Sequence, residues 1–187
     1  QEQFQMTETA SGYRFTSPLR IISDIHIAMP GQHQVSNAAL AIMTSLILQD
    51  RYPQVNLEHI KDGLANSLWL GRTELLAPNL MIDGAHNKES VAALVSVLKT
   101  KYHDKNIHIL FGAIDTKPIA DMLAALEHLG DLQVTSFHYP NAYPLEKYPE
   151  QFGRVADFRD FLTLRKHAKA DDLSLIHISE PTRLGMI

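Results

Sequence analysis

The chain has 187 residues, of which 45% are hydrophobic and 20% are charged, as in an ordinary soluble globular protein. Its formal net charge is −4 and it contains no block of basic residues, which argues against a surface dedicated to nucleic acid. Because the chain has no cysteine, disulfides, thiolate nucleophiles and cysteine-based zinc sites are excluded.

The histidines and the apolar runs indicate neither a metal site nor a membrane segment. The ten histidines are scattered, without His-x-x-x-His or His-Glu-x-x-His spacing. No apolar run approaches the ~20 residues that a transmembrane helix needs. The first residues, 1–5, lack the basic and apolar parts of a signal peptide. We therefore expect a cytoplasmic protein that binds neither membrane nor nucleic acid.

The N-terminal part is predicted to be β-structure followed by two helices. Short runs of apolar and β-branched residues predict strands at 13–15, 19–22 and 24–29. Apolar residues at helical spacing predict helices at 34–49 and 57–67, the second capped by Asn56. This piece is short for a domain with a core of its own.

The remainder of the chain alternates strands and helices. Strands are predicted at 80–83, 107–111, 133–137 and 173–178, and helices at 89–102, 119–129 and 156–170. Alternation at this spacing predicts an α/β domain with a doubly wound parallel sheet and helices on both faces. The proline-rich segment 140–144 is expected to be a loop at the same edge as Asp83, and a plain surface loop is the favoured interpretation.

The segment Met81-Ile82-Asp83-Gly84-Ala85-His86-Asn87 reads as the end of a strand, a tight turn and the start of a helix. Ligands of open α/β sheets bind at the carboxyl ends of strands. A carboxylate such as Asp83 suits a ribose diol there, and the N-terminus of the next helix suits phosphate. The alternative is that Asp83 and Asn87 only cap the turn and the helix.

Two upstream segments carry further polar signals. His33 and Asn37 are four residues apart, on one face of a helix that follows a glycine turn. A carboxamide such as Asn37 can pair with the N6/N7 edge of adenine. In Trp69-Leu70-Gly71-Arg72-Thr73-Glu74, an arginine beside a flexible glycine can swing a positive charge onto a phosphate. Each signal alone is weak, because a polar pair at this spacing or a Gly-Arg turn is usually only a solvated surface.

Taken in order, these motifs closely resemble the folylpolyglutamate synthase/dihydrofolate synthase family of the Mur ligase superfamily. They are Gly-x-His-Gln-x-x-Asn-Ala, Trp-x-Gly-Arg-x-Glu and Asp-Gly-Ala-His-Asn, and the resemblance runs from about Gly12 to about Asp172. The segment 111–117 also resembles the family's Gly-x-x-x-Asp-Lys loop, although the family commonly has Asp where this chain has Pro118.

The resemblance implies a fold and a division into domains. Residues 1–72 would be the β-plus-helix end of the central ATP-binding domain, and 73–178 the Rossmann-like C-terminal domain of a Mur ligase. The chain contains no Gly-x-x-x-x-Gly-Lys-[Ser/Thr] phosphate loop. In the resembled family the phosphate loop, the metal ligands and a modified lysine lie N-terminal to this region, so we expect a C-terminal fragment that is inactive alone. Residues 179–187 depart from the family and are expected to be an unrelated tail.

The resemblance also implies a reaction and roles for individual residues. An ATP- and Mg²⁺-dependent ligase of this family joins glutamate to folate, or makes dihydrofolate from dihydropteroate, through an acyl phosphate. The expected roles are adenine binding for Asn37, phosphate binding for Arg72, ribose binding for Asp83 and a catalytic position near the acyl phosphate for His86. No metal ligand is expected here, and the protein is expected to be a monomer. His33 would shape the turn before Asn37, and Lys117 would face the cleft or be solvated.

Three other interpretations remain open from the sequence. The first is a peptidoglycan Mur ligase that uses the same chemistry on a UDP-sugar peptide. The second is a non-catalytic nucleotide-binding module, which the missing phosphate loop favours. The third is an α/β domain without a ligand.

Overall fold

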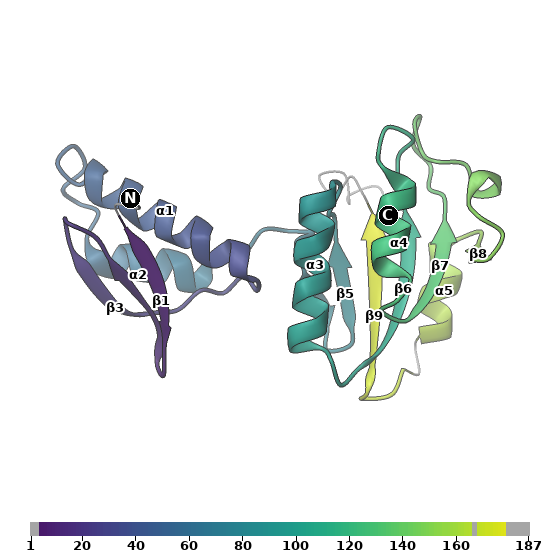
Figure 1. Ribbon diagram of the computed structural model, residues 1–187, viewed down its shortest axis with the longest axis horizontal. Helices are drawn as coiled ribbons and strands as arrows, with labels where there is room; N and C mark the ends of the chain where they lie inside the picture. The colour runs from purple at the N-terminus through teal and green to yellow at the C-terminus, as the bar shows by residue number, and fades with distance from the viewer. Residues whose placement is uncertain (1–3, 166–167, 179–187) are drawn as a thin grey trace. The chain divides into compact units, whose positions relative to one another are not determined.

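The computed structural model describes residues 4–165 and 168–178 and divides the chain into two compact units, with the division between Trp69 and Leu70 (Figure 1). Each unit has a sheet and a hydrophobic core of its own. The expected tail, 179–187, lies outside the described residues.

The first unit is a three-stranded antiparallel sheet covered by two helices. The strands, in the order β1-β2-β3, are β1 (Gln5–Thr9), β2 (Gly12–Thr16) and β3 (Ile21–Ile25). The helices are α1 (Gln32–Leu48) and α2 (Leu57–Asn66), and Asn56 caps α2 as expected. Their apolar faces meet the sheet in one core, which consists of Phe15, Ile22, Ile25, Ala39, Ile42, Leu46 and Ile60.

The strands of the first unit differ from those expected. One strand, β3, replaces the two expected at 19–22 and 24–29, and it ends at Ile25. Asp24 has a left-handed φ of 57° and accepts a hydrogen bond from Ser11 Oγ at 2.7 Å, so the backbone is not extended there. The alternating residues 24–29 therefore belong mostly to a loop. β1 was not expected, because its sequence Gln-Met-Thr-Glu-Thr has little apolar character.

The second unit is built on a six-stranded sheet in the order β4-β5-β9-β6-β7-β8. β4 is antiparallel to β5, and all other neighbours are parallel. The strands are β4 (Glu74–Ala77), β5 (Leu80–Asp83), β6 (Asn106–Gly112), β7 (Asp131–Thr135), β8 (Gly153–Val155) and β9 (Asp172–Ile178).

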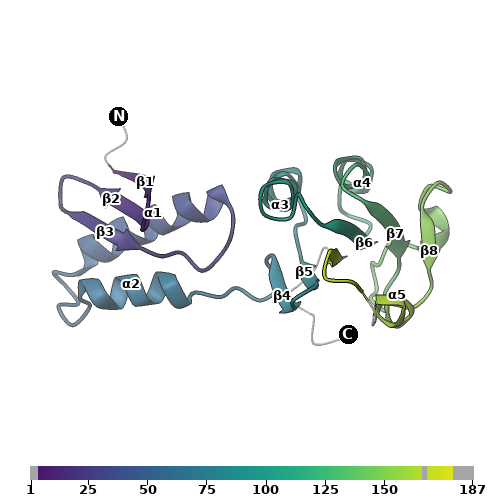
Figure 2. The same cartoon turned by 90° about the horizontal axis from the view of Figure 1, so that it is seen from below.

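Helices cover both faces of this sheet, as the doubly wound prediction requires. α3 (Lys88–Lys101) and α4 (Ile119–Leu126) lie on one face, and α5 (Phe158–Arg165) lies on the other (Figure 2). Alternate strand residues divide accordingly, because successive side chains of a strand point to opposite faces. Met81, Ile109 and Leu175 join the core under α3 and α4, whereas Ile82, Leu110 and Ile176 pack with Phe161.

The expected α/β fold class is confirmed, and the differences lie at the ends and edges of elements. The four expected strands and three expected helices of this unit are present, the strand at 80–83 with the expected bounds and the others with shifted ones. The short edge strands β4 and β8 were not expected. α4 ends at Leu126, and α5 is shorter than the expected 156–170.

The order of the strands creates a switch point beside Asp83. β9 lies between β5 and β6, with α3 following β5 on one face and α5 preceding β9 on the other. In such sheets, ligands bind outside the carboxyl ends of the strands at the place where the connections diverge. Asp83, His177 and Phe111 lie in one register across β5, β9 and β6 at that edge.

The segment 139–148 is bound to the loop after β6 and is not the plain surface loop that was favoured. Ala113 N donates to the hydroxyl of Tyr148 at 3.2 Å, and Ala113 O accepts from Tyr143 N at 2.8 Å. Asp115 N donates to Asn141 O at 2.9 Å. Burial raises the pKa of Tyr148 to about 12, so its hydroxyl stays protonated at neutral pH. The loop 113–117 is thereby fixed at the same edge as Asp83.

We predict that Tyr148→Phe destabilises the second unit by about 1–3 kcal/mol, because Ala113 N–H stays buried without its acceptor. Tyr143→Phe is the matched control, since its hydroxyl donates to an exposed carbonyl, that of Lys147, and its loss costs at most about 0.5 kcal/mol. Urea unfolding at pH 7 measures both variants. Equal effects of the two substitutions would contradict the prediction.

Candidate functional site

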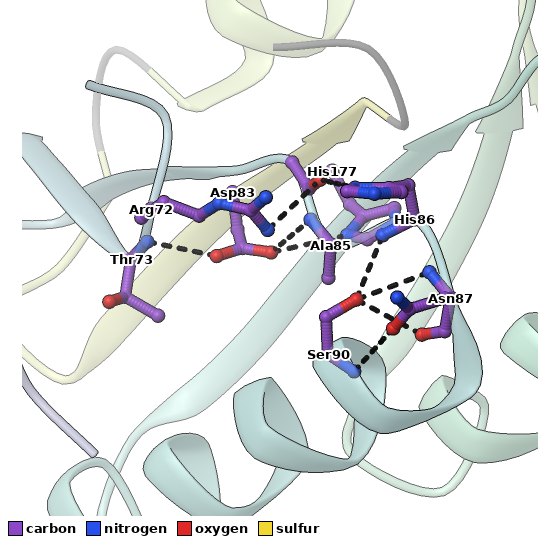
Figure 3. A network of polar contacts seen from close by, with 9 residues as sticks. Arg72, Thr73, Asp83, Ala85, His86, Asn87, Ser90 and His177 are labelled. Atoms are coloured by element: carbon purple, nitrogen blue, oxygen red, sulfur yellow. Dashed lines mark hydrogen bonds and ion pairs between the residues drawn. The ribbon is translucent and has the colours of Figure 1, made fainter. Parts of the chain in front are cut away.

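Asp83 is the last residue of β5, at the carboxyl edge of the sheet where the sequence placed it. β5 is nevertheless the second strand of its unit and not the first, since β4 precedes it. The carboxylate is 6% exposed, and both oxygens accept backbone hydrogen bonds (Figure 3). Oδ2 accepts from Thr73 N at 2.9 Å, and Oδ1 accepts from Ala85 N at 2.7 Å. Asp83 therefore ties the turn before β4 to the turn before α3.

The turn into α3 ends in a capping box. Asn87 is the N-cap, and its Oδ1 accepts from Ser90 N at 2.8 Å. Ser90 Oγ in return accepts from the backbone N–H groups of His86 and Asn87, at 3.0 and 3.1 Å. The sequence did not indicate Ser90, because the usual signal of this motif has Glu or Gln three residues after the N-cap, where this chain has Ser. The capping box orders the start of the helix beside Asp83.

Arg72 is bound into the second unit and does not lie in a free joint. Gly84 N donates to Gly71 O at 2.8 Å, and Arg72 Nη1 donates to Gly84 O at 3.4 Å. Gly71 is buried, and hydrogen bonds to both its N–H and its carbonyl hold it in the second unit. The half-buried guanidinium consequently belongs to the same group of residues as Asp83 (Figure 3).

His86 completes this group. Its Nδ1 lies 3.1 Å from Gly84 O, the carbonyl that also accepts from Arg72. Because a carbonyl can only accept, Nδ1 carries the proton in this hydrogen bond. The structure therefore brings together Arg72, Asp83 and His86 around the backbone of Gly84 (Figure 3).

His177 is a buried neighbour of this group that the sequence did not indicate. Its ring stacks on Phe111 with centroids 5.1 Å apart and planes 6° from parallel. Neither ring nitrogen has a hydrogen-bond partner among the described residues, and Nδ1 lies 3.8 Å from Asp83 Oδ1. Burial, and then the nearby Arg72 and His86, lower the pKa of His177 to about 3. His177 lies in the expected strand 173–178, beyond the resemblance that ends near Asp172, so no motif marked it.

The other candidate residues lie elsewhere in the fold. Asn37 is in α1 of the first unit, where its exposed carboxamide donates to Gln34 Oε1 at 3.1 Å. His33 is exposed and lies in the first turn of α1, which begins at Gln32, one turn before Asn37. Lys117 is half-buried in the loop after β6.

Residues 4–165 and 168–178 contain neither a metal-binding cluster nor a membrane-spanning helix. In these ranges, no three or more His, Asp or Glu side chains are grouped so that they could hold a metal ion. No helix in the same ranges combines the length and the apolar character needed to cross a bilayer.

Residues 71–177 match the family model described as Mur ligase, glutamate ligase domain. The curated dihydrofolate synthase/folylpolyglutamate synthase of Bacillus subtilis is 31% identical over 134 residues, which are 70% of this chain and 31% of that protein. The chain thus spans about a third of the length of this relative.

Two solved structures share the fold over nearly the whole chain. Escherichia coli FolC in complex with DHPP and ADP has a TM-score of 0.79 and 20% identity, covering 95% of this chain and 43% of its own. The bifunctional folylpolyglutamate synthase/dihydrofolate synthase of Yersinia pestis, complexed with AMPPNP and Mn, has a TM-score of 0.77 and 19% identity, covering 97% and 44%.

We predict that Asp83→Ala lowers the free energy of unfolding of the second unit by at least about 2 kcal/mol, because two backbone N–H groups lose a charged acceptor. Asp121→Ala in the exposed first turn of α4 is the control, with an expected loss of at most about 1 kcal/mol from the helix dipole. Chemical denaturation compares them. If Asp83→Ala is as stable as the wild type, the carboxylate does not tie the two turns together.

A second prediction concerns acid stability. An unfolded histidine has a pKa near ~6.5, whereas that of His177 is about 3 in the folded chain, so the folded state binds fewer protons between these values. The contribution of His177 to the free energy of unfolding is therefore constant above about pH 6.5. Below that pH, the free energy of unfolding falls as the pH decreases, by at most about 1.4 kcal/mol per pH unit. His177→Leu should flatten this dependence in urea titrations from pH 7 to pH 4. Parallel curves for the two proteins would show that His177 becomes protonated in the folded state.

Proposed function

Because the chain belongs to the Mur ligase family, we propose that it is part of an ATP-dependent ligase that joins glutamate to a folate. The resemblance inferred from the motifs is confirmed by curated relatives named as folylpolyglutamate and dihydrofolate synthases. The observation that carries the proposal is the meeting of Arg72, Asp83 and His86 at the carboxyl edge of the sheet, beside the start of α3.

The chemistry of these residues fits a nucleotide. The buried Asp83 carboxylate lies at the strand end where ribose hydroxyls bind in open α/β sheets. Arg72 offers a planar donor fork for phosphate oxygens. The N-terminus of α3 adds the positive end of a helix dipole. We assign Asp83 to the ribose, Arg72 to the phosphates and His86 to the catalytic position beside them.

Adenine binding by Asn37 is part of the same proposal. Its carboxamide is exposed on α1 and can exchange its bond to Gln34 for the N6/N7 edge of the base. We further propose that the first unit is the end of the ATP-binding domain and the second unit the C-terminal domain, with the division between Trp69 and Leu70 in place of the expected one after Arg72.

The reaction that we propose passes the terminal phosphate of ATP to a carboxylate of folate or dihydropteroate, after which the amine of glutamate displaces that phosphate to form an amide. Phosphoryl transfer depends mainly on positioning and on neutralising negative charge. Arg72 would supply a fixed charge for the phosphates, and His86 can donate or accept a proton near them. Mg²⁺ would add further positive charge, but we assign it no ligand, because the described residues hold no suitable cluster.

A non-catalytic nucleotide-binding module is the second candidate, because the chain lacks a phosphate loop. A peptidoglycan Mur ligase is the third, and the curated folate-enzyme relatives favour the folate branch over it. Comparing the thermal stabilisation of the full-length ligase by folates and by UDP-sugar peptides would separate these branches. We also propose that the ligase works as a monomer in the cytoplasm.

We predict that the purified 187-residue chain binds ADP without releasing product from folate, ATP and glutamate. Binding is expected because Arg72 and Asp83 are in place, and turnover is not, because the phosphate loop is missing. Calorimetric titration with ADP and a coupled ADP-release assay measure the two properties. Folate-dependent ADP release by this chain would overturn the second half of the prediction.

A sharper prediction concerns Arg72 in the full-length ligase. Arg72→Ala should reduce turnover by a factor corresponding to about 2–4 kcal/mol, the scale of losing one preorganised charge-stabilising donor. Arg72→Lys should restore only part of it, because lysine keeps the charge but loses the planar fork. Steady-state kinetics at saturating ATP give the result. Near-wild-type turnover of Arg72→Ala would contradict the proposed role of Arg72 in binding the phosphates.

A further inference from the structure

Arg72 lies between two residues whose backbone is left-handed. The φ angles are 72° at Gly71 and 44° at Thr73. Glycine adopts such angles readily, but a β-branched residue such as threonine rarely does. A conformation of this kind persists only where the surrounding structure holds it, and such residues gather at functional sites.

Hydrogen bonds hold the backbone on both sides of Arg72. Before it, Gly71 N donates to Glu74 Oε2 at 2.7 Å, and Gly71 O accepts from Gly84 N at 2.8 Å. After it, Thr73 N donates to Asp83 Oδ2 at 2.9 Å. Because Asp83 ends β5 and Gly84 follows it directly, the turn is attached to the carboxyl end of that strand.

The side chain of Arg72 is held as well. Nη1 donates to Gly84 O, the carbonyl that also accepts from His86 Nδ1. A side chain that is already ordered loses less conformational entropy when it binds a ligand. The guanidinium of Arg72 is thereby held in one position beside His86, and it is not carried by a flexible joint.

We propose that Thr73 and Glu74 are positioning residues that form, with Asp83, a clamp holding the Arg72 guanidinium as a fixed cation for the phosphate chain of a nucleotide. The clamp is defined by residues 71–74 and 83–84. This proposal rests on the proposed function for the identity of the ligand, whereas the clamp itself is a property of the second unit.

The first test uses Glu74. Glu74→Ala removes the acceptor of Gly71 N–H, whereas Glu74→Gln keeps an amide oxygen in its place. Glu89→Ala is the matched control, because it removes an exposed carboxylate from the first turn of α3, which makes no clamp bond. In the ¹⁵N-labelled chain, amide exchange at Gly71 and relaxation of Arg72 Nε–H report the order of the backbone and of the guanidinium.

We expect Glu74→Ala to accelerate exchange at Gly71 by about tenfold, the factor for loss of one hydrogen bond, and to make Arg72 Nε–H mobile. Glu74→Gln should restore both signals, and Glu89→Ala should leave both unchanged. If Glu74 only stabilised the fold, its removal would not make Arg72 Nε–H mobile. Glutamine at position 74 would then have no change in Arg72 to reverse. An Arg72 Nε–H that is equally mobile in the wild type and in Glu74→Ala would overturn the clamp.

The second test uses the strained backbone. At Thr73, glycine should give a higher urea midpoint than alanine, because only glycine relieves the positive φ. At Ser96, which is exposed in the middle of α3, the order should reverse, since glycine disfavours helix. The same order of glycine and alanine at both positions would show that Thr73 is not strained.

Titration with ADP separates the clamp from the proposed function. If the clamp serves a nucleotide, Glu74→Ala should bind ADP more weakly than the wild type by about tenfold, with Glu74→Gln close to wild type. A wild-type chain that binds no ADP would count against the proposed nucleotide site, while the relaxation data would still decide the clamp. A mobile Arg72 with unchanged ADP affinity would contradict the positioning role.

Discussion

The second unit depends on one buried carboxylate, that of Asp83, and on the hydrogen bonds that it accepts from two backbone N–H groups. Asp83 joins the turn that contains Arg72 to the turn that leads into α3. A buried carboxylate is costly to leave without partners, so these bonds stabilise both the charge and the turns. The same residue is our candidate for binding ribose. The same side chain therefore serves both the fold and the proposed ribose site. A substitution at Asp83 changes the stability of the second unit and the binding of ribose together.

The position of this carboxylate follows from the order of the strands. With β9 between β5 and β6, connections on opposite faces meet at the carboxyl edge beside Asp83. The loop after β6 is fixed to the same edge by Tyr148. The site is consequently assembled from segments far apart in the sequence, and each is held by backbone hydrogen bonds.

The sequence predicted the regular elements of this unit well, because its buried strands are short runs rich in Leu, Ile and Val that alternate with the helices along the chain. Asp83 and Asn87 were also placed correctly, since a strand end and a helix cap leave local signals. The strand order could not be predicted, because parallel pairing depends on contacts between distant segments. The edge strands β4 and β8 are short and mostly solvent-facing, so they left no pattern.

The local motif around Arg72 shows a different limit. The sequence Gly-Arg predicted a flexible joint, because glycine has the freest backbone of all residues. The structure uses that freedom once, to reach a left-handed φ, and then fixes Gly71 through Glu74 and Gly84. The partners of a glycine cannot be read from its neighbours alone. Similarly, the left-handed φ of Asp24 coincides with a register shift between β2 and β3 that the alternation of residues 24–29 did not predict.

The central place of β9 has a consequence for how the chain acquires its structure. β9 is the last strand of the described residues, yet it forms the only pairing that links β5 to β6 in the described sheet. During synthesis, β5 and β6 are made long before their common partner, so both present unpaired edges that are prone to association with other chains. Pairings between such distant segments also slow folding. Loss of residues 172–178 would therefore remove the middle of the sheet and not merely shorten its end.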